Sequence, residues 1–124
     1  MRKPLSVGLV EDDSILSFVM TKYIEKMGRV CVFVAKKGDD AVRLAREYKP
    51  GIILMDLNLA GSYDGVEAAT RIREFWEGPF VFLTGNSDGQ SLDRIRSLPG
   101  ARWLIKPVDF KDLQAYLNAL EAEL

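Results

Sequence analysis

Residues 51–56 read Gly51-Ile52-Ile53-Leu54-Met55-Asp56, an apolar run that ends at a carboxylate. A short, continuous run of this kind predicts a β-strand buried on both faces, as in parallel sheets covered by helices. Three further apolar runs also stop at polar residues: Val7–Val10 at Glu11-Asp12-Asp13, Phe80–Leu83 at Thr84, and Trp103–Ile105 at Lys106. Because the carboxyl ends of parallel strands lie at one edge of a sheet, we expect these polar residues to meet there.

Segments with helical spacing of apolar residues separate these strands. We expect helices over about residues 13–28, 38–48, 65–76, 86–98 and 109–120, with Asp13 and Asp109 as N-caps. The first helix carries Ile15 and Phe18 among its apolar positions, and the third is expected to include Trp76.

The alternation of strands and helices indicates the fold class. With residues 30–35 as another strand, five strand–helix units predict one α/β domain with a doubly wound five-stranded parallel sheet. The segment 86–98 has few apolar positions and many residues that disfavour helices, so its helix is predicted to be marginally stable.

Composition excludes several classes of function. The chain has 124 residues, a net charge of −1 and no histidine, so His-ligated zinc, Ser-His-Asp catalysis and phosphohistidine on this chain are excluded. The single cysteine, Cys31, lies in an apolar run and is expected to be a buried, unreactive thiol. No apolar stretch reaches the length of a membrane span, and we expect a cytoplasmic protein without membrane insertion or direct nucleic-acid binding.

The predicted sheet edge gathers three carboxylates, those of Glu11, Asp12 and Asp56, against the single ammonium of Lys106. Two such charges about 4 Å apart repel by roughly 4 kcal/mol at an effective dielectric near 20, so the cluster favours a bound cation. Oxygen ligands select a hard ion, which points to Mg²⁺, with Mn²⁺ or Ca²⁺ as substitutes. Asp56 is then a candidate nucleophile that would form an aspartyl phosphate.

The four motifs Val10-Glu11-Asp12-Asp13, Met55-Asp56-Leu57-Asn58, Leu83-Thr84-Gly85 and Ile105-Lys106-Pro107 occur in this order. Together they resemble the receiver domain of two-component response regulators, over essentially the whole of residues 1–124. The resemblance implies a flavodoxin-like (βα)5 fold with strand order 2-1-3-4-5. The chain contains no output domain, and its start at Met1 and end after the last expected helix favour a stand-alone receiver.

The resemblance also implies roles for individual residues. Asp56 matches the phosphoacceptor, and Asp12 matches the acid that ligates Mg²⁺ directly. Glu11 matches the acid that reaches the ion through water, and the backbone carbonyl of Asn58 matches the remaining protein ligand. Lys106 matches the lysine that pairs with the phosphoryl oxygens, and its bond to Pro107 is usually cis in this family.

A switch is implied by the same resemblance. Thr84 matches the hydroxyl residue that moves to hydrogen-bond the phosphoryl group, and Trp103 occupies the place of an aromatic residue that turns inward. The implied donor is a phosphohistidine on a sensor histidine kinase or a histidine phosphotransfer protein. An unknown downstream protein would read the face formed by the fourth helix, fifth strand and fifth helix. The chain would take part in its own phosphorylation and dephosphorylation without being a turnover enzyme.

Three other functions are weighed against this one. A phosphatase or phosphotransferase of the haloacid dehalogenase type would need a second acid where this chain has Asn58. A flavodoxin-like FMN-binding protein is disfavoured because Glu11-Asp12-Asp13 would repel the FMN phosphate, and a pseudo-receiver would only dock partners.

The loop 60–65 is about one residue longer than is common in receiver domains. Asn58 and Asn86 would flank the path of a hydrolytic water.

Overall fold

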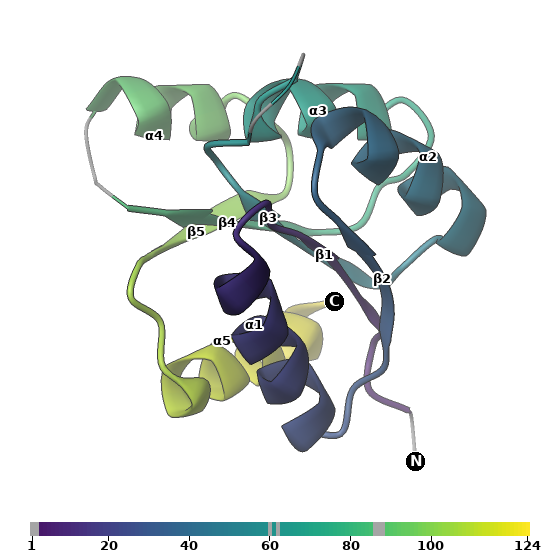
Figure 1. Cartoon of the computed structure of the whole chain (residues 1–124), viewed down its shortest axis with the longest axis vertical. Helices are drawn as coiled ribbons and strands as arrows, with labels where there is room; N and C mark the ends of the chain where they lie inside the picture. The colour runs from purple at the N-terminus through teal and green to yellow at the C-terminus, as the bar shows by residue number, and fades with distance from the viewer. Residues whose placement is uncertain (1–2, 60, 62, 86–88) are drawn as a thin grey trace.

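Five strands alternate with five helices in the part of the chain that the computed structural model describes, residues 3–59, 61, 63–85 and 89–124 (Figure 1). In chain order these are β1 (Val7–Val10), α1 (Ser14–Lys26), β2 (Cys31–Ala35), α2 (Gly38–Tyr48), β3 (Ile52–Asp56), α3 (Gly65–Ile72), β4 (Phe80–Thr84), α4 (Gly89–Arg96), β5 (Ala101–Ile105) and α5 (Phe110–Glu123). Ala60 and Ser62 of the long loop, and Asn86, lie outside the described residues.

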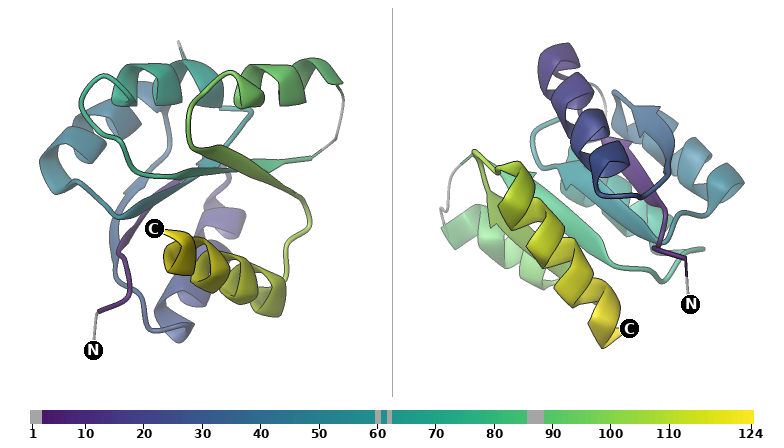
Figure 2. Two further views of the ribbon diagram at one scale, coloured as in Figure 1. Left: turned by 180° about the vertical axis from the view of Figure 1, so that it is seen from behind. Right: turned by 90° about the horizontal axis from the view of Figure 1, so that it is seen from below.

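The strands form one parallel sheet in the order β2-β1-β3-β4-β5, which confirms the predicted fold class. Helices α1 and α5 cover one face of the sheet, and α2, α3 and α4 cover the other (Figures 1 and 2). This three-layer arrangement follows from right-handed crossovers on both sides of β1. All five strands therefore end at the same edge.

Two apolar clusters fill the space between the sheet and its helices. One lies under α1 and α5 and includes Met20, Ile24 and Leu117; the other lies under α2, α3 and α4 and includes Ala45 and Ile72. The three central strands β1, β3 and β4 are buried along their whole length. The expectation of burial on both faces is wrong for β5, where Ile105 is 48% exposed, because β5 lies at the edge of the sheet.

Helix α1 begins as predicted but buries a different face. Asp13 caps it, since its Oδ1 accepts a hydrogen bond from the Leu16 N–H at 2.9 Å. Ser17, Met20 and Ile24 face the core, whereas Ile15 and Phe18 lie on the surface. Sheet residues cover only one stripe of a helix, and periodicity alone does not select the stripe when apolar residues occur on both sides.

Helix α3 is shorter than predicted, ending at Ile72 instead of near Trp76. Trp76 is buried in the turn that follows, where its indole Nε1 donates to the Pro50 carbonyl at 2.8 Å. Helix α5 begins as predicted: Asp109 caps its start, and Leu113, Leu117 and Leu120 are buried. A buried aromatic residue with a hydrogen-bonded N–H packs equally well in a turn and in a helix, so its apolar spacing was a poor guide to the boundary.

Cys31 is half-buried, so the expectation of a buried thiol is only partly met. Its Sγ donates to the Phe33 carbonyl at 3.3 Å, and partial burial raises the thiol pKa. A raised pKa keeps the thiol protonated and therefore weakly nucleophilic. Among the described residues, no helix combines the length and apolar content required to cross a membrane.

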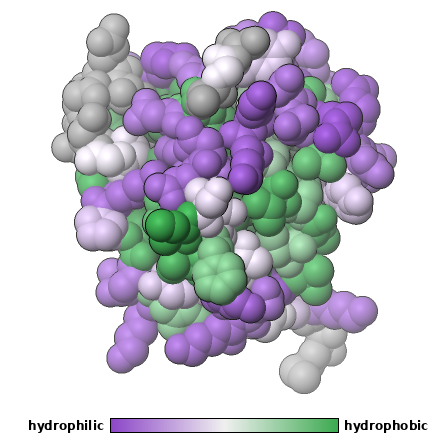
Figure 3. Space-filling model, viewed as in Figure 1, coloured by the Kyte–Doolittle hydropathy of each residue, from purple (hydrophilic) through white to green (hydrophobic). Residues whose placement is uncertain are grey.

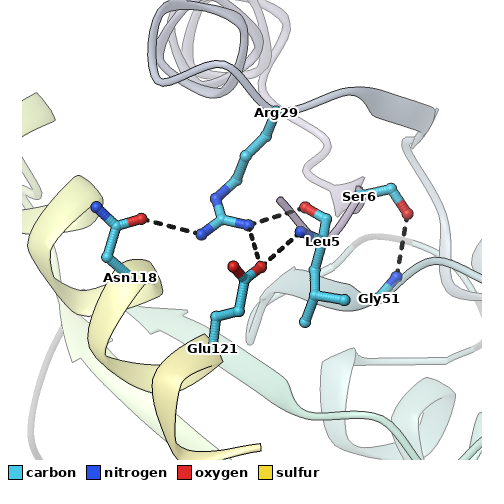
Figure 4. A network of polar contacts seen from close by, with 6 residues as sticks. All are labelled: Leu5, Ser6, Arg29, Gly51, Asn118 and Glu121. Carbon is cyan, nitrogen blue, oxygen red and sulfur yellow. Dashed lines mark hydrogen bonds and ion pairs between the residues drawn. The ribbon is translucent and has the colours of Figure 1, made fainter. Parts of the chain in front are cut away.

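A buried arginine joins three parts of the chain opposite the carboxyl ends of the strands (Figure 4). The guanidinium of Arg29 donates to the Leu5 carbonyl at 2.9 Å and to Asn118 Oδ1 at 3.1 Å, and it forms an ion pair with Glu121 Oε1 at 2.9 Å. The Arg29 side chain is 1% exposed. These contacts tie the start of β1 and the turn after α1 to the end of α5.

Candidate functional site

The acidic residues meet at the carboxyl edge of the sheet, as predicted. Glu11 follows β1, and its backbone N–H extends the ladder to β2 by donating to the Ala35 carbonyl at 2.9 Å. Asp56 is the last residue of β3, the strand next to β1. Carboxylate oxygens of Glu11, Asp12 and Asp56 lie within 4.8 Å of one another. Parallel pairing of β1 with β3 thus converts two distant sequence positions into one cluster.

Lys106 brings the positive charge to this cluster from the end of β5. Its Nζ lies 3.4 Å from Asp56 Oδ1 and 3.5 Å from Glu11 Oε1. The lysine is positioned by its own backbone, because its N–H donates to the Thr84 carbonyl at 2.7 Å. The Lys106–Pro107 peptide bond is cis, as the resemblance implied.

The pKa of the Glu11 carboxyl is unusually high. The residue is 1% exposed, and burial raises the pKa of its carboxyl to about 7. The hydrogen bond to Asp56 and the charge of Asp56 act in the same direction, whereas the Asp13 N–H, 3.2 Å from Oε2, and Lys106 oppose them. One ammonium therefore does not neutralise the cluster, and a further cation would be favourable here.

The donor set fits a hard divalent ion. Glu11 and Asp56 are buried, while Asp12 is exposed, so protein oxygens face an opening to solvent. Carboxylate oxygens with access to water match the preference of Mg²⁺, which retains part of its hydration shell in proteins. No sulfur or imidazole ligand lies in the cluster that these described residues form.

The remaining predicted site residues lie close to Asp56 or on the neighbouring strands. Asn58 is exposed just beyond β3, and its backbone N–H donates to Asp56 Oδ1 at 3.2 Å. Thr84 ends β4 and is buried. Trp103 lies on β5 opposite Phe82, two positions back from the Thr84–Ile105 pair, and is half-buried. The sheet register therefore places Trp103 two positions before the end of β5, on the strand next to the one that Thr84 ends.

The loop after Asp56 is packed tightly against the acceptor strand. The Gly65 N–H donates to the Leu57 carbonyl at 3.0 Å, and a Cβ at Gly65 would collide with the Asp56 carbonyl oxygen. Only glycine permits this close approach of two backbones. Asp64, just before it, caps α3 and also forms an ion pair with Arg94 of α4. Sequence reasoning missed this pair; the helix-cap pattern Asp64-Gly65-Val66-Glu67 marks one partner only.

A second feature that sequence reasoning missed lies on α1. Ile15 is 79% exposed and Phe18 is 63% exposed, one helical turn apart. Figure 3 shows apolar side chains gathered in the middle of the face that α1 occupies, beneath a band of hydrophilic ones. Beside α1, Leu16, Met20, Lys106 and Val108 are among the residues that line a pocket of about 320 Å³. An apolar surface therefore adjoins the lysine of the site.

Two curated relatives are similar to this chain. One is the transcriptional regulatory protein PdtaR of Mycobacterium tuberculosis, with 30% identity over 110 residues, or 89% of this chain and 53% of the relative. The other is the transcriptional regulatory protein AfsQ1 of Streptomyces coelicolor, with 31% identity over 117 residues, or 93% of this chain and 50% of the relative. The chain spans about half the length of these relatives.

A solved structure is similar over nearly the whole chain. It is the receiver domain of the sensor histidine kinase PA1611 from Pseudomonas aeruginosa PAO1, with a magnesium ion coordinated in its active site cleft. The identity is 27%, the TM-score is 0.82, and the match covers 95% of this chain and 98% of that one. The sequence pattern that defines the response regulator receiver domain matches residues 7–118. On this evidence the chain belongs to the receiver domain family of two-component response regulators.

Proposed function

We propose that residues 1–124 form a receiver domain in which Asp56 accepts a phosphoryl group from a partner's phosphohistidine and Mg²⁺ assists. The observation that carries this proposal is the position of Lys106 Nζ, 3.4 Å from Asp56 Oδ1, within a cluster of three carboxylates at one strand edge. An ammonium at that distance can also offset the charge of a phosphoryl group bonded to the same carboxylate.

The proposed transfer balances without an oxidant or reductant. A carboxylate oxygen of Asp56 forms a P–O bond as the P–N bond of the phosphohistidine breaks, and the electron pair of that bond stays with the imidazole nitrogen. Lys106 holds positive charge beside the phosphoryl oxygens, and the Thr84 hydroxyl supplies a further donor. Glu11, Asp12, Asp56 and the Asn58 carbonyl would hold Mg²⁺, which when bound neutralises and orients the phosphoryl oxygens.

A direct test uses phosphoramidate, a small donor with the same P–N bond as phosphohistidine. Incubated with this donor and Mg²⁺, the protein should gain the mass of one phosphoryl group, and chelation should prevent the gain. Asp56→Asn should remain unmodified under the same conditions. A wild type that stays unmodified would exclude the proposed function, and an adduct that persists in Asp56→Asn would move the acceptor to another residue.

Mg²⁺ should stabilise the folded protein, because the ion binds a cluster that exists only after folding. At a concentration ten times its Kd, Mg²⁺ should add about 1.4 kcal/mol, or roughly 4–8 °C in melting temperature. Thermal unfolding with MgCl2, compared with NaCl at equal ionic strength, measures this difference. Asp12→Asn should lose most of the shift, whereas Asp39→Asn, in the exposed first turn of α2, should keep it.

The apolar surface of α1 is the proposed contact for the phosphohistidine partner. Large exposed apolar side chains beside a site are typical of protein–protein interfaces. The test uses a sensor kinase that phosphorylates the wild type. Phe18→Ser should lower the rate of phosphoryl transfer from this kinase by about 10-fold or more, since truncation of an interface anchor costs roughly 2 kcal/mol. Labelling by phosphoramidate should not change. Equal slowing with both donors would instead indicate damage to the site.

A downstream partner is proposed to read the face of α4, β5 and α5. Support comes from Trp103, which is half-buried on edge strand β5 and lies beneath Arg96 of α4, with 5.1 Å between the guanidinium carbon and the ring centroid. A movement of α4 would therefore change the exposure of an aromatic side chain. The activity of any longer protein containing this domain would depend on segments beyond it.

A haloacid-dehalogenase-type phosphatase is the alternative that shares most of the site. That chemistry requires an acid two residues after the nucleophile, and Asn58 occupies this position. An amide cannot act as general acid or base at neutral pH. Steady release of phosphate from generic phosphate esters would favour the phosphatase. A protein that neither forms the adduct nor turns over esters would instead act as a pseudo-receiver that docks partners.

A further inference from the structure

Arg94, in the last turn of α4, reaches across to the loop that follows the candidate phosphoacceptor. Its Nη2 lies 2.9 Å from Asp64 Oδ2 and 3.2 Å from Asp64 Oδ1. Asp64 is also the N-cap of α3, because Oδ1 accepts a hydrogen bond from the Glu67 N–H at 2.9 Å. The Asp64 carboxylate thus caps α3 and forms an ion pair with α4.

The backbone between Asp64 and Asp56 connects the Arg94 ion pair to the candidate phosphoacceptor. Gly65, bonded to Asp64, is packed so closely against β3 that a Cβ there would strike the Asp56 carbonyl oxygen. Its N–H also donates to the Leu57 carbonyl at 3.0 Å. Asp64 cannot shift along the chain direction without disturbing this contact, so the ion pair links α4 to the acceptor strand.

The opposite side of α4 makes a different contact. Arg96 follows Arg94 by two positions, or about 200° around the helix, and its guanidinium lies over Trp103 of β5. Figure 1 shows α4 beside α3 in one helix layer, above the edge of the sheet that β5 forms. Helix α4 is therefore held laterally between the acceptor loop and the aromatic side chain of the proposed output face.

We propose that the Arg94–Asp64 ion pair is a resting-state lock, which holds α4 against the acceptor loop until the site is phosphorylated. Arg94 acts as a positioning residue. The lock couples the site to α4 by a second route, in addition to the movement proposed for Thr84. The inference rests on the proposed function of Asp56. A phosphoryl group stabilises a rearranged loop, and the rearrangement must break this pair.

The exposure of the pair sets the size of the effect. The side chains of Arg94 and Asp64 are 48% and 37% exposed, so water screens their attraction. Exposed pairs of this kind shift an equilibrium by about two- to fivefold. A lock of this strength biases α4 without fixing it, as a switching element requires.

Thermodynamic reciprocity predicts the direction in which loss of the ion pair changes binding at the site. If occupation of the site must break the pair, removing the pair beforehand must tighten binding at the site by the same factor. Arg94→Gln and Asp64→Asn should therefore bind beryllofluoride, a phosphoryl mimic, about two- to fivefold more tightly in the presence of Mg²⁺. Long-range electrostatics predicts opposite signs, because one variant removes a positive charge and the other a negative charge near an anion.

The experiment measures beryllofluoride affinity by titration calorimetry and hydrogen exchange across residues 92–98. Asparagine retains the N-cap at position 64, so α3 should remain intact in Asp64→Asn. Both single variants should show tighter binding and about two- to fivefold faster exchange in the unliganded protein, and the double variant should go no further than either. Arg43→Gln is the matched control, since it removes an exposed pair with Asp40 that lies wholly within α2.

The outcomes separate the lock from the function of the site. Unchanged or weaker binding by Arg94→Gln would overturn the lock, as would opposite shifts in the two single variants or full additivity in the double. If wild-type protein forms the phosphoryl adduct while Arg94→Gln binds like the wild type, only the lock fails. If the wild type forms no adduct and binds no beryllofluoride, the proposed function and the lock fail together.

Discussion

Replacing Arg29 with methionine should lower the free energy of unfolding by about 3–5 kcal/mol, which corresponds to a fall in melting temperature on the order of 10–20 °C. The guanidinium pairs with Glu121 and satisfies the Leu5 carbonyl and Asn118 Oδ1 (Figure 4). Its removal would break the ion pair of a carboxylate that is 20% exposed and would remove the guanidinium donor from the Leu5 carbonyl.

Urea unfolding followed by circular dichroism would measure the loss. The control is Arg102→Met, because Arg102 also pairs with a glutamate of α5, Glu123, but at the surface, where such pairs contribute about 0–1 kcal/mol. Adding Glu121→Gln to Arg29→Met should recover part of the stability, since the double variant no longer holds a carboxylate that has lost its guanidinium partner. A loss below 1 kcal/mol for Arg29→Met would show that the network does not hold these segments together.

Replacing Lys106 with glutamine should slow phosphorylation of Asp56 by about 10²–10³-fold, the usual cost of removing one electrostatic donor from a transfer site. Lys106 Nζ lies within 3.5 Å of both Asp56 and Glu11. The same change should tighten Mg²⁺ binding, because the ammonium competes with the ion for the same carboxylates. The two effects have opposite signs, so general damage to the site cannot produce both.

The rate of adduct formation with phosphoramidate and the Mg²⁺ affinity from calorimetry test the two halves of this prediction. Lys111→Gln serves as the control, since Lys111 is exposed on α5 and forms no ion pair among those found in the described part of the chain. An adduct formed at the wild-type rate would show that Lys106 does not act on the phosphoryl group. Weaker Mg²⁺ binding would show that it organises the carboxylates instead of competing for them.

The parallel sheet and the convergence of its polar ends were predictable because they depend on local pattern. A buried central strand such as β3 must be apolar along its length, and the carboxyl ends of parallel strands meet wherever the strands pair. Glu11, Asp56 and Lys106 were thus brought together from apolar runs and their terminal residues alone. Caps at Asp13 and Asp109 were also predictable, since a cap is a contact over three residues.

The errors arose where several segments compete for the same space. Ile15 and Phe18 are as apolar as buried residues, but the sheet covers the other stripe of α1. Trp76 continues the spacing of α3, yet it packs in the turn beyond because its indole N–H finds the Pro50 carbonyl there. In each case the outcome depends on which partner lies opposite, which a one-dimensional pattern does not contain.

The amino-acid sequence alone was sufficient for the strand–helix alternation, the acidic edge and the identity of the candidate phosphoacceptor, because each follows from short-range pattern and strand polarity. The Arg29 network, the exposed stripe of α1 and the Arg94–Asp64 pair emerged only from the tertiary structure. The contacts of the Arg29 network and the Arg94–Asp64 pair join residues that are 24 to 92 positions apart, and their geometry depends on how whole helices pack against the sheet.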